Sequence, residues 1–211
     1  PEMPTPNFPV GWRLTAAASP EVLWRTVRRI GGKDGYYFAD RLWRLRGALD
    51  RLAGGRGLGP RRPPESRPAE GEQFDFWRVL KVVAPRRLLL LSEMKAPGAA
   101  LLDLTLTPQS ENHSEIRLVS TFIPRGLAGL IYWHAFYPAH VHVFRGMPAG
   151  IARAAGAEAR LPEMLAGLGS FPESEVASIV FFVAIEFDTC AGLNAGEVDL
   201  GKLAVAGELA H

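Results

Sequence analysis

The chain has 211 residues, which is enough for one domain of ordinary size and an appendage. Its hydrophobic fraction of 47% is that of a globular protein and excludes disorder throughout the chain. The net charge of +2 hides a division, because residues 1–157 carry a net charge of +9 and residues 158–211 carry −7. This asymmetry predicts a boundary near residue 157, with a basic domain before it and an acidic C-terminal extension after it.

The start of the chain and its cysteine bear on its cellular context. The sequence begins at Pro1 without an initiator methionine or a signal peptide, which suggests a fragment or a processed piece of a longer protein. The single cysteine, Cys190, cannot form an internal disulfide bond, and we expect it to be a small apolar core residue. A reducing, cytoplasmic location is therefore expected.

The first predicted elements are a strand and a helix. Residues 1–9 contain four prolines and are expected to form an extended lead-in. Apolar and polar residues alternate over residues 10–18, which predicts a strand. Ser19 can cap a helix that starts at Pro20, where the missing N–H of proline has no cost. The apolar face of this helix comprises Val22, Leu23, Val27 and Ile30, and Gly31-Gly32 ends it.

Residues 36–52 are predicted to form an amphipathic helix. Its apolar residues recur at steps of three and four, at Phe38, Leu42, Leu45, Leu49 and Leu52. Its other face carries Arg41, Arg44, Arg46 and Arg51. A loop rich in Gly, Pro and Arg follows over residues 53–68 and is expected to be mobile.

The next part of the chain changes to the period of β-strands. An antiparallel meander of about four strands is expected over residues 72–83, 88–94, 101–107 and 116–123. A long apolar helix is expected over residues 126–155, broken by Pro138 and Pro148. A strand, helices, a meander and a last helix define an α+β fold, not the repeated βαβ order of a parallel sheet.

Several clusters of aromatic residues and arginine resemble a known family. They read ASPE at 18–21 with Trp24, YY at 36–37, WRLRG at 43–47, DFWRV at 75–79, PRGL at 124–127, YW at 132–133 and FRGM at 144–147. Together with the element order, they make residues 10–155 similar to the START-like (SRPBCC, polyketide-cyclase-like) superfamily, and within it to a domain family of unknown function. Members of that family often follow an NAD(P)-binding, nucleoside-diphosphate-sugar-epimerase-like domain in one polypeptide. The resemblance implies a helix-grip fold, in which an antiparallel sheet curves around a long C-terminal helix and leaves an apolar cavity.

That cavity is expected to take a small apolar or lipid-like ligand. The candidate ligand-binding residues are Trp43, Arg46, Phe76, Trp77, Arg78, Met94, Tyr132 and Trp133. Each aromatic residue among them has an alternative role in the ordinary core. Arg44, Arg46 and Arg78 either hold a carboxylate or phosphate at the cavity mouth, or lie in solvent and pair with Asp40 or Asp75.

Metal and nucleic-acid partners have weak support in the sequence. His134, His140 and His142 do not share one helix face, and no Asp, Glu or Cys accompanies them, so no metal site is expected. The arginine-rich stretch at residues 41–67 comes without any nucleic-acid-binding motif, so no nucleic-acid partner is expected.

A membrane-spanning role has weak support as well. Residues 126–144 form a run without charged side chains, but three histidines and an internal proline make it a poor spanning helix. A core helix gripped by the sheet explains the run better. Arg125 and Arg145 flank it, which leaves peripheral membrane contact open.

The functional interpretation is a ligand-binding module of a larger protein, with no cofactor in this chain. The alternative is a substrate-side domain of an NAD(P)-dependent oxidoreductase, or a cyclase-like enzyme. Cyclase chemistry would need a paired acid and base in the cavity, where Asp75, Glu93 and Asp103 are the nearest carboxylates. Residues 158–211 faintly resemble the end of short-chain dehydrogenases, at Gly192 and at Val198-Asp199-Leu200-Gly201, but the chain lacks that family's glycine-rich dinucleotide loop and Tyr-x-x-x-Lys pair. No catalytic constellation is therefore identified.

Overall fold

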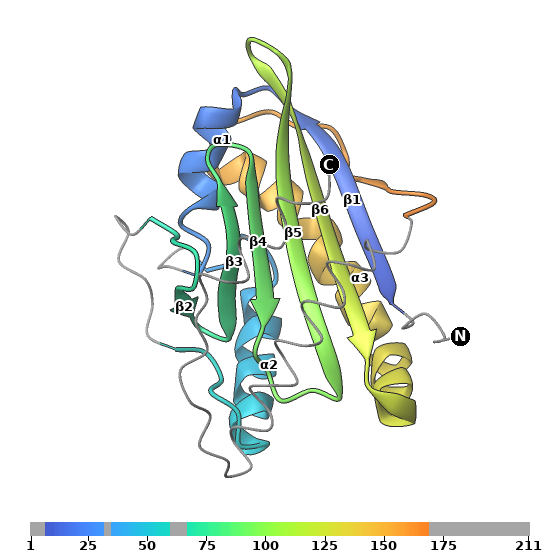
Figure 1. Cartoon of the computed structure of the whole chain (residues 1–211). Helices are drawn as coiled ribbons and strands as arrows, with labels where there is room; N and C mark the ends of the chain where they lie inside the picture. The colour runs from blue at the N-terminus through green and yellow to red at the C-terminus, as the bar shows by residue number, and fades with distance from the viewer. Residues whose placement is uncertain (1–6, 32–34, 60–66, 169–211) are drawn as a thin grey trace, which may run out of the picture. The chain divides into compact units, whose positions relative to one another are not determined.

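The computed structural model describes residues 7–31, 35–59 and 67–168 (Figure 1). In this part of the chain, one antiparallel sheet has the strand order β2-β3-β4-β5-β6-β1-β7. The strands are β1 (Phe8–Ala16), β2 (Gln73–Phe74), β3 (Trp77–Val83), β4 (Arg87–Ser92), β5 (Gly98–Ser110), β6 (His113–Pro124) and β7 (Glu163–Met164). The helices α1 (Pro20–Val27), α2 (Asp40–Leu52) and α3 (Gly126–Ala154) all lie on the same face of this curved sheet. The predicted α+β helix-grip fold is confirmed.

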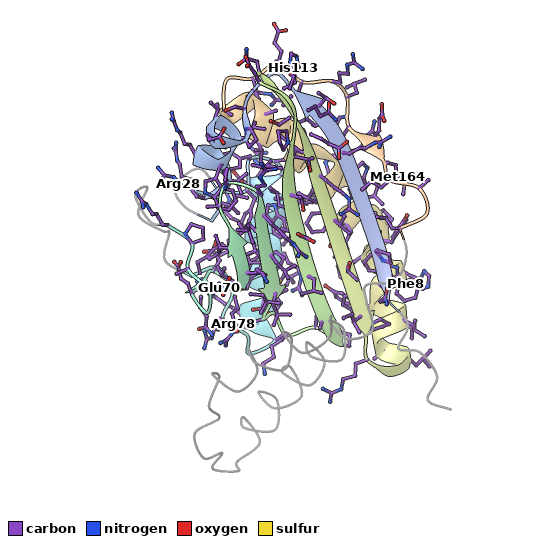
Figure 2. The ribbon with its side chains drawn as sticks, turned by 45° about the horizontal axis from the view of Figure 1, so that its top comes forward. Phe8, Arg28, Glu70, Arg78, His113 and Met164 are labelled. Atoms are coloured by element: carbon purple, nitrogen blue, oxygen red, sulfur yellow. The ribbon has the colours of Figure 1, made fainter. Side chains whose placement is uncertain are left out.

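The β5–β6 hairpin forms the centre of the sheet. Leu106 pairs with Ile116 and Leu104 pairs with Leu118, so apolar side chains at every second position face the helices. β1 extends the sheet on the other side of β6. The turn of the hairpin projects beyond the neighbouring strands and carries His113 at its tip (Figure 2).

The first strand and helix follow the sequence pattern closely. Ser19 precedes α1 in an extended conformation, and Pro20 occupies the first helical position. The Ser19 side chain makes no capping hydrogen bond. The helix ends at Val27, so Ile30, expected on its apolar face, is buried from the turn that follows it.

α3 is one continuous helix of 29 residues, although the sequence predicted interruptions at Pro138 and Pro148. A proline inside a helix removes one backbone hydrogen bond, and packing against β1 and β6 compensates for that loss here. The C-terminal half of α3 packs closely on the segment before α2. A Cβ atom on Gly146 would collide with the Phe38 ring, so only glycine allows this approach.

α2 begins at Asp40 and not at residue 36. Tyr37 and Ala39 have positive φ angles of 63° and 55°, so the chain turns before the helix starts. The buried residues of α2 are Trp43, Gly47 and Asp50. The apolar face expected from the sequence is largely exposed, at Leu42, Leu45, Leu49 and Leu52.

The sheet domain continues beyond the boundary expected near residue 157. β7 pairs with Trp12 and Arg13 of β1, and the backbone N–H of Ala17 donates to the carbonyl of Glu158 at 2.8 Å. Backbone pairing, and not net charge, decides which segments join a sheet, so residues 158–164 belong to it. Residues 169–211 of the acidic extension, with Cys190 and the dehydrogenase-like positions, lie outside the described residues, as does the middle of the loop expected over 53–68.

Candidate ligand-binding pocket

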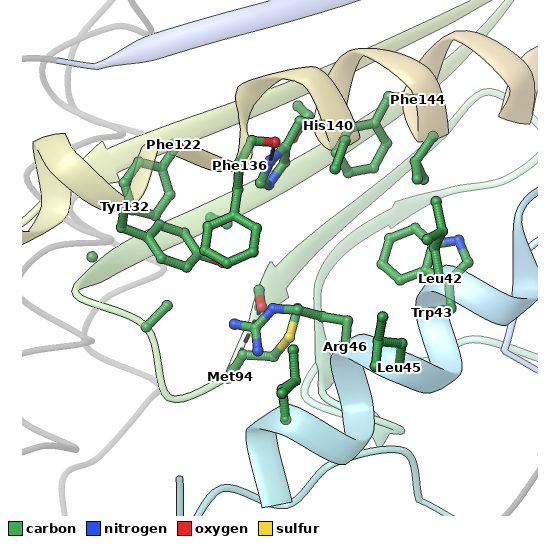
Figure 3. Close-up of a pocket in the computed structure, with 18 of the residues that line it drawn as sticks. Leu42, Trp43, Leu45, Arg46, Met94, Phe122, Tyr132, Phe136, His140 and Phe144 are labelled. Carbon is green, nitrogen blue, oxygen red and sulfur yellow. Dashed lines mark hydrogen bonds between the residues drawn. The ribbon is translucent and has the colours of Figure 1, made fainter. Parts of the chain in front are cut away.

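A pocket of about 160 Å³ lies between the sheet, α2 and α3 (Figure 3). Its floor is formed by Trp77, Ser92, Met94, Ala96, Gly98, Ala100, Ser120 and Phe122. Its walls are formed by Leu42, Trp43, Leu45, Arg46 and Leu49 of α2, and by Tyr132, Phe136, Ala139, His140, Val143 and Phe144 of α3. No carboxylate is among these lining residues, so the pocket combines apolar walls with one permanent positive charge.

The floor is hollow because small side chains replace leucines at one end of the sheet. At the filled end, Leu104 of β5 pairs with Leu118 of β6. Toward the pocket, the helix-facing position of β6 is Ser120, and Ala100 of β5 pairs with Ser92 of β4. Three small residues on adjacent strands leave a volume that the helices do not fill, although protein interiors are normally close-packed.

The rim of the pocket is apolar and yet exposed to solvent. Leu42, Leu45 and Leu49 are 39%, 56% and 43% exposed, and Phe136 on α3 is 40% exposed. Phe122 on the floor is only 2% exposed. Burial therefore decreases from the floor to the rim, and the pocket opens between α2 and α3.

A buried carboxylate holds α2 beside the pocket. Asp50 is fully buried and accepts the backbone N–H groups of Gly57 at 2.8 Å and Lys95 at 2.6 Å. The neighbouring Arg51 donates to the carbonyl of Leu58. A buried carboxylate needs such donors, because an uncompensated charge inside a protein is costly. These bonds fix α2 to the loop that follows it and to the loop between β4 and β5.

Aromatic side chains pack against one another at both ends of the pocket. The ring centroids of Trp43 and Tyr36 are 4.4 Å apart in a stacked arrangement, and Phe144 meets Trp43 edge-on at 5.9 Å. At the other end, Phe122 and Tyr132 pack with their centroids 5.4 Å apart. Such arrangements contribute beyond simple area burial, so these walls are well defined.

Arg46 extends from α2 toward the pocket (Figure 3). Its guanidinium carbon lies 5.9 Å from the centroid of the Tyr132 ring on α3, which is within cation–π range. One of its terminal nitrogens, Nη2, is buried and has no hydrogen-bond partner among the described residues. A buried donor without an acceptor is unfavourable, so the protein holds the Arg46 side chain beside the pocket at a cost in stability.

His140 adds a second polar group to the wall. Its Nδ1 lies 2.9 Å from the carbonyl oxygen of Phe136, and because a carbonyl only accepts, Nδ1 carries the proton. Burial lowers the pKa of His140; the Phe136 carbonyl raises it to a smaller extent, and the nearby Arg46 lowers it further. The ring is therefore neutral at pH 7, and Nε2 is left as an acceptor.

Five of the eight residues predicted to bind ligand line the pocket, at Trp43, Arg46, Trp77, Met94 and Tyr132. Phe76 does not, because it is fully buried in the core and stacks on the other side chains of that region, with its ring 5.9 Å from Trp43. It has the structural role that the sequence left open for each aromatic residue.

Two more predicted residues lie away from the pocket. Trp133 is buried and stacks on Phe122 in a nearly parallel arrangement at 5.6 Å, so it supports the floor without lining it. Arg78 lies at the β2–β3 edge of the sheet and forms an ion pair with Glu93 (Figure 2). Arg44, the third arginine considered, is exposed on α2 and is not a lining residue.

Sequence reasoning missed most of the walls and the hollow floor. Phe136 and His140 fall in a helix whose apolar run was interpreted as ordinary core. The leucines of α2 were recognised as a face, but not as a pocket rim. The signal that could have found the floor is the occurrence of the small residues Ser92, Ala100 and Ser120 in strands that are otherwise rich in large apolar residues.

The carboxylates considered for acid–base chemistry have other partners. The Tyr36 hydroxyl donates to Asp75 at 2.7 Å. Burial, and then the charge of Asp75, raise the pKa of Tyr36 well above its ordinary value, so the hydroxyl remains a donor. Asp103 accepts two hydrogen bonds from Arg87 at 3.0 and 2.8 Å, and Glu93 is the partner of Arg78. Asp75, Glu93 and Asp103 are all absent from the pocket lining.

Two further observations concern metal sites and membranes. Within residues 7–31, 35–59 and 67–168, no group of three His, Cys, Asp or Glu side chains is placed to hold a metal ion. The histidines of α3 lie against different rings: His134 against Phe8, His140 against Trp133 and His142 against Phe38. Over the same described ranges, no helix has the length and apolar character needed to cross a bilayer.

The fold and the pocket together define a helix-grip α+β domain with an apolar pocket held between its sheet and two helices. The chain belongs to the family DUF2867, described as a protein of unknown function, which matches residues 5–147. This match runs from β1 into the second half of α3 and so includes every element that lines the pocket. No curated protein matches the sequence significantly.

Solved structures from several organisms are similar to this chain. An HSP90 activator from Plasmodium falciparum is 12% identical over 73% of this chain and 99% of its own, with a TM-score of 0.40. Norcoclaurine synthase from Thalictrum flavum is 13% identical over 74% and 94%, with a TM-score of 0.41. The Zhui aromatase/cyclase from Streptomyces sp. R1128 is 12% identical over 72% and 94%, with a TM-score of 0.40. At these identities and TM-scores, the similarity says nothing about which ligand this chain binds or which reaction it catalyses.

Proposed function

We propose that this domain binds a small apolar molecule in the pocket between the sheet, α2 and α3. The observation that carries the proposal is the hollow floor beneath an exposed apolar rim. A bound ring would cover the rim and remove its own surface from water, and each Å² of apolar surface buried is worth roughly 25 cal/mol. A concave, mainly apolar site with a few polar groups is the usual form of a small-molecule site.

The size of the pocket favours a ligand body of about one ring. A cavity of about 150 Å³ holds a molecule the size of benzene, and this pocket measures about 160 Å³. A longer, lipid-like molecule would have to extend past the exposed rim at Leu45 and Phe136. The proposal is therefore narrower than the apolar or lipid-like ligand expected from the sequence.

An enzymatic role in the same pocket has less support. Proton transfer needs an acid or a base within hydrogen-bonding reach of the substrate. The lining offers one imidazole, on His140, and no carboxylate with which it could share a proton. A binding role needs neither an acid nor a base in the pocket and agrees better with the apolar walls.

We also propose that the domain serves as a module beside an NAD(P)-binding domain in its parent protein. The support is the resemblance of the aromatic and arginine motifs alone. Reading the gene upstream of the codon for Pro1 tests this proposal. An upstream open reading frame that encodes no dinucleotide-binding domain would contradict this proposal.

Filling the pocket tests the binding proposal. Ala139 is an exposed lining residue of α3, and Ala139→Trp should place an indole in the pocket mouth. Ala135→Trp is the matched control, because Ala135 is exposed on the same helix and does not line the pocket. We expect Ala139→Trp to weaken binding of a one-ring apolar probe by at least about tenfold, or about 1.4 kcal/mol, while Ala135→Trp binds like the wild type.

Native mass spectrometry and a titration with toluene provide the two readouts. A small molecule retained by the wild type and the control, but not by Ala139→Trp, supports the proposal. Equal binding of toluene by all three proteins would place its site elsewhere. Absence of both a retained molecule and toluene binding in the wild type would contradict a ligand-binding role.

A further inference from the structure

The pocket lining contains a positively charged hydrogen-bond donor but no negatively charged side chain. Arg46 is the one arginine or lysine among the lining residues, and no Asp or Glu lines the same space. Its Nη2 is buried without a hydrogen-bond partner in the part of the chain that the structure describes. A guanidinium carries five N–H donors in a planar fork, so an acceptor placed beside it would form charge-assisted bonds.

The neighbours of Arg46 do not supply a hydrogen-bond acceptor for Nη2. The Tyr132 ring, 5.9 Å from the guanidinium carbon, interacts with the positive charge through its face but accepts no conventional hydrogen bond there. Arg44, two residues earlier on the same helix, is exposed and can be hydrated freely. Arg46 instead projects toward a pocket whose other side chains are mostly apolar (Figure 3). The protein thus places a partly buried cation at its own ligand site, where a ligand can supply the counter-charge.

We propose that the ligand of this pocket is an amphipathic carboxylate, whose ring occupies the hollow floor and whose carboxylate binds Arg46. This inference rests on the proposed function and adds the chemical class of the ligand. One guanidinium neutralises one negative charge, so a monoanion fits this lining better than a phosphate dianion, for which a second cation would be needed. A carboxylate also matches the guanidinium fork in two parallel hydrogen bonds.

A purely structural role for Arg46 makes the opposite prediction for stability. If Arg46 served mainly to stabilise the fold through its cation–π contact with Tyr132, removing its charge would destabilise the domain. If Arg46 serves to bind an anionic ligand, the ligand-free protein carries an unsatisfied buried donor. Arg46→Met should then raise the Tm of the ligand-free protein. Methionine matches the unbranched stem of the arginine side chain as far as Nε, so the packing of that stem is largely retained. Arg44→Met is the matched control and should leave the Tm unchanged.

The binding test compares two probes that differ in one group. 3-Phenylpropanoate and 3-phenylpropanamide share a ring and a linker, and only the first carries a negative charge. We expect wild type and Arg44→Met to bind the acid at least about tenfold more tightly than the amide, which corresponds to about 1.4 kcal/mol. Arg46→Met should bind both probes equally, near the affinity of the wild type for the amide.

The outcomes separate this inference from the proposed function. Equal binding of acid and amide by the wild type, or a preference for the acid that survives in Arg46→Met, would overturn the assignment of a carboxylate to Arg46 and leave the apolar pocket standing. Failure of the wild type to bind either probe would count against both proposals. Tighter binding of 2-phenylethyl phosphate than of 3-phenylpropanoate would overturn the assignment of a monoanion. A lower Tm in Arg46→Met than in Arg44→Met would assign Arg46 a structural role.

Discussion

The two ends of the helix-facing side of the sheet are built differently. At the filled end, the C-terminal half of α3 belongs to the same buried core as Leu104 and Leu118 of the β5–β6 hairpin, and Ile151 is fully buried. At the pocket end, the N-terminal half of the same helix leaves Ile131 62% exposed. The strands beside the two halves of the helix differ as well. The strands offer leucines at one end and Ser92, Ala100 and Ser120 at the other.

This contrast shows where the domain departs from ordinary packing. Filling the pocket with three more leucines would bury more apolar surface and would stabilise the fold. Exposing the leucines of α2 and orienting an arginine toward an apolar space are unfavourable in the same way. Such local departures commonly mark functional sites, because stability is given up there for binding.

The largest expected effect is a difference between two isoleucines of one helix. Ile151→Ala should lower the free energy of unfolding by about 2 to 5 kcal/mol, because it opens a cavity in the filled end. Ile131→Ala should change it by less than about 0.5 kcal/mol, because that side chain is already in solvent. Denaturant unfolding of both variants measures the comparison, and their helix propensities change equally. Similar losses in both variants would mean that the two isoleucine side chains are buried to a similar extent.

A smaller effect is expected from His140 as the pH falls. Its pKa in the folded protein is lower than in the unfolded chain, so the unfolded state binds the proton more readily below about pH 6.5. The contribution of His140 to stability is therefore complete above that pH and decreases as the pH falls toward its folded pKa. The charge that acts on the ring is that of Arg46, and no lining carboxylate opposes it.

His140→Gln should remove this part of the pH dependence. Between pH 7.5 and pH 5, its stability relative to the wild type should rise, as measured by denaturant unfolding at each pH. His134→Gln, at an exposed position of the same helix, should follow the wild type. A stability difference between His140→Gln and wild type that stays constant over this range would show that the ring titrates as it does in the unfolded chain.

Much of the fold could be predicted from the sequence. Alternating apolar residues marked β1, the leucine-rich strands and their turns marked the meander, and the long apolar run marked α3. The errors occurred where tertiary contacts override local pattern. The leucine spacing of α2 indicated a buried face, but Asp50 and its two backbone donors turn a different side of the helix inward. Likewise, charge placed residues 158–164 outside the domain, whereas pairing with β1 places them in the sheet.

The site could be predicted only in part. Aromatic and arginine motifs led to Trp43, Arg46 and Tyr132, all of which line the pocket. The same motifs also led to Phe76 and Trp133, because local sequence does not tell which side of a stacked pair faces a cavity. The hollow floor depends on small residues from three strands, so it becomes visible only when the strand register is known.

The most direct test of the account uses the five tryptophans as internal reporters. Trp43 and Trp77 line the pocket, whereas Trp12 and Trp24 lie elsewhere in the domain. The measurement is an NMR titration of the indole N–H signals with 3-phenylpropanoate. We predict saturable shifts that are largest for Trp43 and Trp77, with Trp12 and Trp24 unchanged. Saturable shifts confined to Trp12 or Trp24, or no shift of any indole signal, would contradict a ligand site between the sheet, α2 and α3.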